Sequence, residues 1–432
     1  MADNETPATC IVQTVPPEIA AKIFTHCLSD STSAPDPNTA PLLLGRICRD
    51  WRNLVQDCPQ LWASLKIDQS RIPVSLIETW LSRAQSIPLI LELCVPGLED
   101  DDWDAAKFIT VFQRHSQTWR DVTLDLPGEQ LYLFGSDLPL PLLERLTMTD
   151  CFPEAALPCN AFRNAHALRQ LTLARAVHPA VLQLPWTEIT TFQSPSGSLL
   201  PEEFLTILQY TPNIVDCTVT LYNESESDGL PDVAQLAFLA SLSLETLIPG
   251  ALDVFDHISV LALRRLDLSS ILFSGRVLVS RLHPFLSRPS CQLRELCIRI
   301  DGDKPREDHF IQLLETQPAL ERLDLVEGSL GLLIAICQRL SDGSPLLPRL
   351  TSLRASPHIY PASEITNTFP VMLDALADAL TSRWVSDSFA QIQDCTLSWS
   401  GVVTDDLEKI VVAFRPRQKQ LVALGINMNV VQ

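Results

Sequence analysis

Apolar residues recur along most of the chain in one short pattern. From about residue 119, an apolar residue is followed by two variable positions, a second apolar residue, one variable position and a third apolar residue. Strong copies lie at 143–148 (LERLTM), 168–173 (LRQLTL), 263–268 (LRRLDL), 293–298 (LRELCI) and 320–325 (LERLDL). Weaker copies lie at 119–124, 189–194, 214–219, 350–355, 392–397 and 421–426. The alternation that ends each copy predicts a β-strand.

The strong copies that are neighbours in sequence lie about 25–30 residues apart, which is the period of a leucine-rich repeat, a strand followed by a helix or an irregular return. Segments 201–212, 307–318 and 371–384 have helical spacing between copies, and 328–337 suits a buried helix. One such unit cannot bury its apolar face alone, so the units must stack. The pattern predicts an α/β (α+β) chain whose residues 115–432 form an irregular, curved solenoid, with strands on the concave face and helices on the convex face.

Alternate strand positions point away from the buried leucines, toward the concave face. These positions are candidates for binding a protein target, although plain solvation explains most polar residues on such a face. The candidates are Arg145, Thr147, Thr149, Gln170, Thr172, Arg265, Asp267, Ser269, Glu295, Arg299, Arg322 and Asp324.

The N-terminal region has helical rather than strand periodicity. Residues 15–28 carry an apolar stripe after Pro17, a residue suited to a first helical turn. A polar, proline-rich loop follows at 29–41, and Pro59 ends a second helical stripe. That stripe consists of Leu44, Ile47, Cys48, Trp51 and Val55. A second tryptophan, Trp62, comes directly after the break.

Between these regions, residues 74–84 read as a helix and 89–95 as a strand, which together would cap the first repeat. An acidic run follows at 98–104. Closely spaced carboxylates without a turn glycine are typical of a solvated loop rather than of a cation site, so we expect no metal there.

The composition excludes several classes of protein. The chain of 432 residues is 46% hydrophobic, which predicts a large folded core rather than disorder. Its net charge of −20 argues against a sequence-independent grip on nucleic acid or on anionic lipid, because both need clustered Lys and Arg. The acidic N-terminus contains no apolar run, and no apolar stretch reaches membrane-spanning length, so we expect an intracellular protein, cytoplasmic or nuclear.

Motifs for enzyme chemistry are missing from the sequence. None of the 12 cysteines is spaced as Cys-x-x-Cys, and most fall at apolar positions, which favours small core residues over zinc ligands. The chain has no glycine-rich phosphate loop, no His-Glu-x-x-His and no Gly-x-Ser-x-Gly. We therefore expect a non-catalytic protein without a metal or cofactor.

The N-terminal pattern resembles the F-box. Residues 15–24 (VPPEIAAKIF) are similar to its opening Leu-Pro-x-Glu-Ile phrase, with Val15 for leucine. Residues 45–55 (GRICRDWRNLV) are similar to its Val-Cys-Arg-x-Trp helix, and 59–62 (PQLW) to its closing Pro-x-Leu-Trp. Together with 77–84 and 115–127, the order of motifs resembles basidiomycete F-box proteins with irregular leucine-rich repeats. The resemblance spans nearly the whole chain and is specific over 15–65.

That resemblance implies docking on the adaptor subunit of an SCF-type cullin–RING ubiquitin ligase. It would also explain the two tryptophans, since a partner would cover apolar surface that so small a segment cannot bury. The residues implied for adaptor contact, or for the core beneath it, are Pro16, Pro17, Ile19, Ile23, Phe24, Leu42, Leu43, Ile47, Trp51, Leu61 and Trp62. The implied organisation is a disordered tail at 1–14, the F-box at 15–66, a connecting helix and capping strand at 67–114, and the solenoid at 115–432.

Two functions stay open on sequence grounds. The first is the substrate receptor of an SCF ligase, in which the F-box docks on the adaptor, and through it on a cullin, while the solenoid binds a protein target. The alternative is a leucine-rich-repeat interaction scaffold whose F-box is not used in a ligase. The sequence identifies no target.

Overall fold

The computed structural model describes residues 16–29, 32, 34–68, 72–94, 105–149, 158–175, 177–222, 230–246, 249–270, 275–300, 306–359, 366–401 and 405–430. The predicted tail at 1–14, Val15 and the acidic run at 98–104 lie outside these residues. The chain divides into two compact units, residues 1–189 (unit 1) and 190–432 (unit 2).

Unit 1 begins with short helices and continues as a parallel sheet. Its helices are α1 (Pro17–Thr25), α2 (Leu44–Ile47), α3 (Arg49–Gln56), α4 (Val74–Ala84) and α5 (Ala105–Arg114), with 3-10 turns η2 (Pro59–Trp62), η3 (Ser116–Thr118), η4 (Gly128–Phe134) and η5 (Trp186–Glu188). Its strands are β1 (Ser64–Ile67), β2 (Leu89–Cys94), β3 (Trp119–Asp125), β4 (Arg145–Met148) and β5 (Gln170–Leu173). Consecutive strands pair in parallel from β1 to β5.

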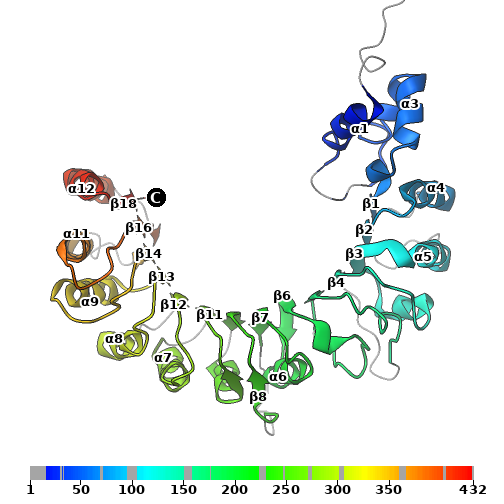
Figure 1. Cartoon of the computed structure of the whole chain (residues 1–432). Coiled ribbons are helices and arrows are strands. Elements are labelled where there is room, and N and C mark those ends of the chain that lie inside the picture. The colour runs from blue at the N-terminus through cyan, green and yellow to red at the C-terminus, as the bar shows by residue number, and fades with distance from the viewer. Residues whose placement is uncertain are drawn as a thin grey trace, which may run out of the picture. The chain divides into compact units, whose positions relative to one another are not determined.

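The register of unit 1 stacks one apolar residue of each strand on the next. Leu65 lies beside Leu91, which lies beside Val122, and all three are at most 2% exposed. Helices α4 and α5 lie on one side of these strands (Figure 1). The leucines therefore form a core between the strands and the helices, as the repeat predicts.

Unit 2 continues the same plan. Its paired strands are β6 (Thr191–Leu199), β7 (Asp216–Leu221), β9 (Ser241–Thr246), β11 (Arg265–Ser270), β12 (Glu295–Ile300), β13 (Arg322–Val326), β14 (Ser352–Ser356), β16 (Asp394–Leu397) and β18 (Asn427–Val430), all parallel and in that order. Short strands β8 (Ala234–Leu236) and β10 (Ile258–Val260) pair with each other, as do β15 (His358–Ile359) and β17 (Ser400–Gly401).

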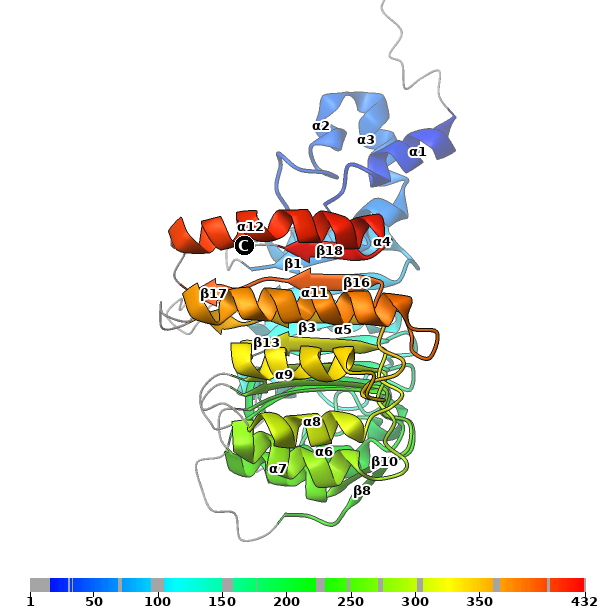
Figure 2. The same ribbon diagram turned by 90° about the vertical axis from the view of Figure 1, so that its left-hand side faces the viewer.

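Helices return the chain of unit 2 from one strand to the next. They are α6 (Pro201–Tyr210), the 3-10 helix η6 (Pro249–Asp256), α7 (Gly275–Leu286), α8 (Glu307–Glu315), α9 (Leu330–Ser341), α11 (Phe369–Val385) and α12 (Asp405–Ala423). Figure 2 shows α9, α11 and α12 lying one above another with nearly parallel axes, on the side of the sheet opposite the exposed strand face. The predicted strand-and-helix array is confirmed in each unit, with the mixed α/β class and the long parallel sheets expected of leucine-rich repeats.

The predicted repeat differs from the structure in three details. The copy expected at 421–426 is not a strand, because α12 extends to Ala423 and the chain turns at Gly425, whose φ is +103°, before β18 begins at Asn427. Strand β9 was not predicted, although Leu239, Leu242 and Leu244 fit the same pattern and are all buried. The pattern also extends further toward the N-terminus than expected, since β1 pairs with β2 and gives it a neighbour on both sides.

Candidate protein-interaction surfaces

The first candidate surface lies on α1 and α2. Ile19 and Ile23 are 49% and 52% exposed, and Leu43 and Ile47 are 42% and 54% exposed. Each pair is spaced i, i+4, so its two side chains lie on the same face of the helical turn. We call these four residues the N-terminal apolar positions. Exposed large aliphatic side chains in this concentration are typical of a surface that a partner covers.

Aromatic contacts hold the helices that carry these positions. Phe24, which is 1% exposed, packs against Trp51 of α3 with ring centroids 4.8 Å apart. The indole N–H of Trp62 donates to the backbone carbonyl of Val55 at 2.8 Å and ties the end of α3 to η2. The side chain of Arg52 donates to the Gly45 carbonyl at 2.8 Å and links α3 to α2. The apolar positions therefore stand on a packed base.

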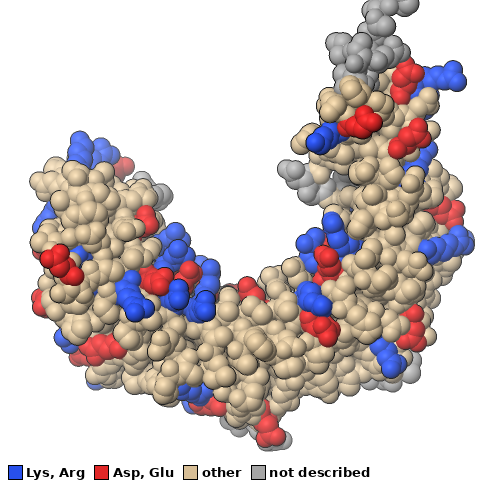
Figure 3. All heavy atoms as spheres, viewed as in Figure 1, with Lys and Arg blue, Asp and Glu red and all other residues tan. Residues whose placement is uncertain are grey.

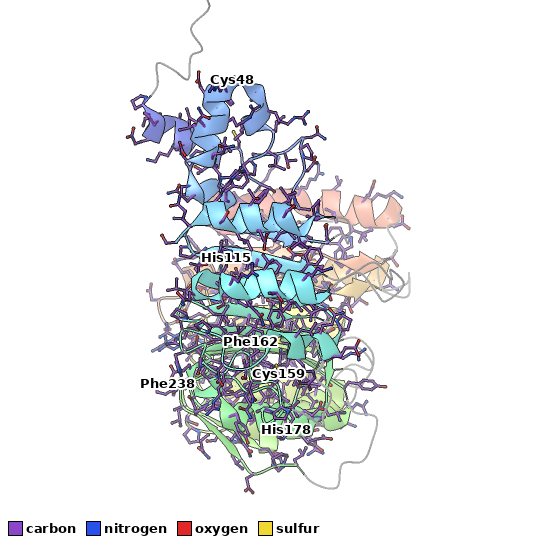
Figure 4. The ribbon with its side chains drawn as sticks, turned by 90° about the vertical axis from the view of Figure 1, so that its right-hand side faces the viewer. Cys48, His115, Cys159, Phe162, His178 and Phe238 are labelled. Carbon is purple, nitrogen blue, oxygen red and sulfur yellow. The ribbon has the colours of Figure 1, made fainter. Side chains whose placement is uncertain are left out.

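The single helix predicted over the second stripe is wrong at Cys48. This residue is extended (φ −154°, ψ 175°), and its Sγ accepts from the backbone N–H of Trp51 at 3.5 Å, so it caps a new helix. It lies at the junction of α2 and α3 (Figure 4). A continuous helix would have placed Ile47 on the same face as Trp51. The break instead leaves Ile47 exposed.

The eleven residues implied by the F-box resemblance separate by burial. Phe24, Leu61 and Trp62 are buried, each 1% exposed, while Leu42 and Trp51 are half-buried. The exposed ones are Pro16, Pro17, Ile19, Ile23, Leu43 and Ile47. The first group can act only as core, and the last group is free to contact a partner.

The exposed apolar surface of α1 and α2 is aliphatic, and Trp62 contributes none of it. Trp62 is covered inside unit 1 by α4, where Trp80 meets it edge-on at 4.9 Å and the Arg83 guanidinium lies 4.5 Å from its ring centroid. The indole N–H of Trp51 is also buried. The surface left for a partner consists of smaller aliphatic side chains.

The second candidate surface is the exposed strand face of each unit. In unit 1, Arg145 pairs with Asp121 of the neighbouring strand at 2.6 Å, and Lys66 pairs with Glu92 at 2.6 Å. The Lys66 ammonium and a Thr32 hydroxyl hold the pKa of Glu92 below its usual range, against the opposing effect of burial. Of the other predicted candidates of this unit, Thr149 and Gln170 are exposed, and Thr147 and Thr172 are half-buried.

In unit 2 the register arranges the predicted residues in rows across the strands. Arg265, Glu295 and Arg322 form one row, in which Glu295 pairs with Arg265 at 3.5 Å and with Arg322 at 3.2 Å. Charged side chains of both signs gather on the strand side of this part of unit 2 (Figure 3). The alternating signs neutralise one another within the row, and such exposed pairs add little stability.

The next row contains Asp267, Cys297, Asp324 and Arg354. Burial raises the pKa of Asp324, and Asp267 adds to that effect, although Arg354 pairs with Asp324 at 3.5 Å. Burial also raises the pKa of the Cys297 thiol to about 12, with further contributions from Asp267 and Asp324. In the third row, Ser269 lies beside Arg299.

Cys297 should therefore resist alkylation even though it is only half-buried, because the thiolate is the reactive form. At about pH 8 we expect iodoacetamide to modify Cys297 at least about tenfold more slowly than Cys27, which is exposed on unit 1. Peptide mass spectrometry of the native protein over a time course measures both rates. Equal rates would contradict the protonated, carboxylate-flanked thiol.

Sequence reasoning missed several residues of the strand faces. Lys66 and Glu92 lie on strands before residue 115, where no repeat was expected, and Asp121 begins the exposed alternation of β3. Cys297 and Arg354 occupy outward positions of recognised copies. The period-2 alternation in these strands could have identified all of them.

Among the described residues, no group of three or more His, Cys, Asp or Glu side chains is arranged to hold a metal ion. No helix in the described part of the chain is both long and apolar enough to cross a membrane.

No family model and no curated protein matches the sequence. Among solved structures, the chain is similar to an internalin (inlF) from Listeria monocytogenes, with 12% identity and a TM-score of 0.32, over 81% of this chain and 93% of the internalin. The resemblance to the F-box therefore rests on the motifs of residues 15–65 alone.

Proposed function

We propose that this chain is the substrate-recognition subunit of an SCF-type cullin–RING ubiquitin ligase. The observation that carries the proposal is the exposure of Ile19, Ile23, Leu43 and Ile47 on a helical unit whose sequence resembles the F-box. In this proposal the N-terminal apolar positions dock on the adaptor, and the strand-and-helix array binds a protein target. The protein performs no chemistry itself, and its contribution is to position the target near the ubiquitin-loaded enzyme.

The polarity of the two surfaces supports this division of roles. An interface of standard size, about 1,600 Å², draws most of its energy from a few central anchors. The N-terminal apolar positions can supply such anchors because Phe24, Trp51 and Trp62 fix the helices beneath them. The strand faces instead present charged rows, which favour specificity for a partner over raw affinity.

Charge placed at the N-terminal apolar positions should abolish adaptor docking without unfolding the chain. The double variant Ile23→Asp with Leu43→Asp puts carboxylates at two exposed sites, so we expect adaptor binding to fall more than about tenfold. Titration of the full chain with purified adaptor measures the loss. A matched control, Val371→Asp with Val385→Asp, places the same charges at exposed sites of α11, 51% and 73% exposed, and should bind normally. Native-like binding by the first variant would contradict the docking site.

The same variant separates a receptor from a scaffold. A receptor and a scaffold would both keep the partners that bind the strand-and-helix array. Only in a receptor would the loss of adaptor binding stop the transfer of ubiquitin to those partners. We expect array-bound partners to accumulate in cells that express the Ile23→Asp, Leu43→Asp variant at the native level. Quantitative proteomics against the Val371→Asp, Val385→Asp control measures this. Unchanged abundance of every partner would favour the scaffold, the second candidate.

A further inference from the structure

Unit 2 contains a pocket of about 420 Å³ at the edge of its sheet, where the chain enters the strands. The loops before β11, β12, β13 and β14 form it, and three arginines, Arg264, Arg294 and Arg349, line it. No acidic residue is among its lining residues. We call it the arginine pocket.

The repeat itself brings the first two arginines together. The backbone N–H of Arg294 donates to the carbonyl of Arg264 at 2.7 Å, and the N–H of Glu321 donates to the carbonyl of Arg294 at 2.8 Å. These three residues therefore occupy equivalent positions in consecutive repeats. Strands in a sheet lie about 4.8 Å apart, so Arg264 and Arg294 are direct neighbours of the same charge. Such an arrangement costs stability rather than adding it.

The charge of the pocket is largely uncompensated. Arg294 has one counter-ion, Glu321, at 3.6 Å, with both side chains about half-exposed. Within the described part of the chain, Arg264 and Arg349 make neither an ion pair nor a side-chain hydrogen bond, and both are exposed. Their guanidinium donors are thus free. This differs from the neighbouring strand face, where Arg265 and Arg322 share Glu295.

The remaining lining is mixed, and the pocket is small. Leu261 is 63% exposed and Ala262, Pro289 and Ala319 are also apolar, while Ser290 and Gln292 add polar groups. Guanidinium groups bind carboxylate and phosphate oxygens through paired N–H donors. A long polyanion would need an extended basic surface, whereas this chain carries a net charge of −20. The pocket fits a single anionic group on a partly apolar segment.

We propose that the arginine pocket binds an anionic side chain, a carboxylate or a phosphate monoester, presented by a protein partner. The proposal rests on the proposed function in that the array is taken to bind a protein. The target would be recognised through its anionic side chain, at the edge of unit 2 where the chain enters the strands, beside the strand face.

Three bead-bound peptide libraries test the proposal with the full-length protein. All have random flanking residues, and they carry a fixed phosphoserine, glutamate or serine. We expect at least about tenfold more protein retained on the phosphoserine or the glutamate library than on serine, and the stronger of the two identifies the source of the anion. Equal retention on all three overturns the proposal. A single-stranded oligonucleotide is the fourth probe, and binding to it alone would also overturn the proposal.

Variants assign the binding to the pocket. Arg264→Gln with Arg349→Gln should reduce the retained protein to the level of the serine library. Arg306→Gln with Arg339→Gln removes the same charge from exposed sites of unit 2 and should change retention less than about twofold. Leu261→Asp keeps all three arginines but supplies a competing carboxylate, so it should weaken binding too. Native-like retention by the first and third variants overturns the proposal. Each variant is also titrated with adaptor. Loss of peptide binding by the arginine pocket is thereby distinguished from loss of adaptor docking through α1 and α2.

Discussion

Replacing Trp62 with alanine should destabilise unit 1 by about 3–5 kcal/mol, the usual cost of truncating a buried tryptophan. The side chain is 1% exposed, contacts Trp80 and Arg83, and donates its N–H to the Val55 carbonyl. Six of the eight tryptophans precede residue 190, so intrinsic fluorescence during urea unfolding reports mainly on unit 1. The loss of stability is measured by a lower urea midpoint, with no change in the slope of unfolding free energy against urea concentration.

Two further variants sharpen that experiment. Trp62→Phe keeps most of the volume but removes the indole donor from the Val55 carbonyl, so we expect a smaller loss of about 1–3 kcal/mol. Ile23→Ala removes an exposed side chain of the same unit and should change stability by less than about 0.5 kcal/mol. If all three variants unfold like the native protein, Trp62 does not join the N-terminal helices to α4.

Leu266→Asp should open the centre of unit 2. Leu266 is 0% exposed and lies in register between Leu242 and Leu296, so a carboxylate there has no partner in the apolar core. Burying an unpaired charge costs several kcal/mol, and neighbouring repeats depend on one another for burial. We expect limited proteolysis to produce cuts within residues 190–432 that the native protein does not show.

The control makes the same substitution at an exposed leucine. Leu261 is 63% exposed, so Leu261→Asp should leave the proteolysis pattern unchanged. We also expect the Leu266→Asp chain to retain adaptor binding through unit 1, because repeat arrays transmit damage mainly between neighbours. Simultaneous loss of adaptor binding would mean that the two units fold as one.

The sequence predicted most of the repeated architecture because each strand is specified locally. The apolar pattern identified β4, β5, β11, β12 and β13, whose inward residues such as Leu146 and Leu323 are at most 1% exposed. It failed where local preferences compete. Residues 421–426 match the pattern, but α12 continues through Ala423, so the last strand starts later, at Asn427.

The candidate sites were less predictable, because exposure depends on contacts between elements. Ile47 and Trp51 belong to one stripe in the sequence, yet the cap formed by Cys48 separates them. The sequence leaves Trp62 as either a partner contact or a core residue, and its packing against Trp80 and Arg83 of α4 makes it core. The resemblance to the F-box points to residues 15–65 and does not separate core from surface there, because burial depends on how the helices pack.

By itself, the sequence determined the alternation of strands and helices and the side of each strand that faces the core, since both follow from residue periodicity. Only the tertiary structure decided which charges meet across strands and which apolar residues stay exposed. Arg264, Arg294 and Arg349 come from separate repeats. Stacking places Arg264 and Arg294 side by side at equivalent positions, and Arg349 joins them from the loop before β14. Proximity of that kind is set by the packing of repeats and is not encoded in any one of them.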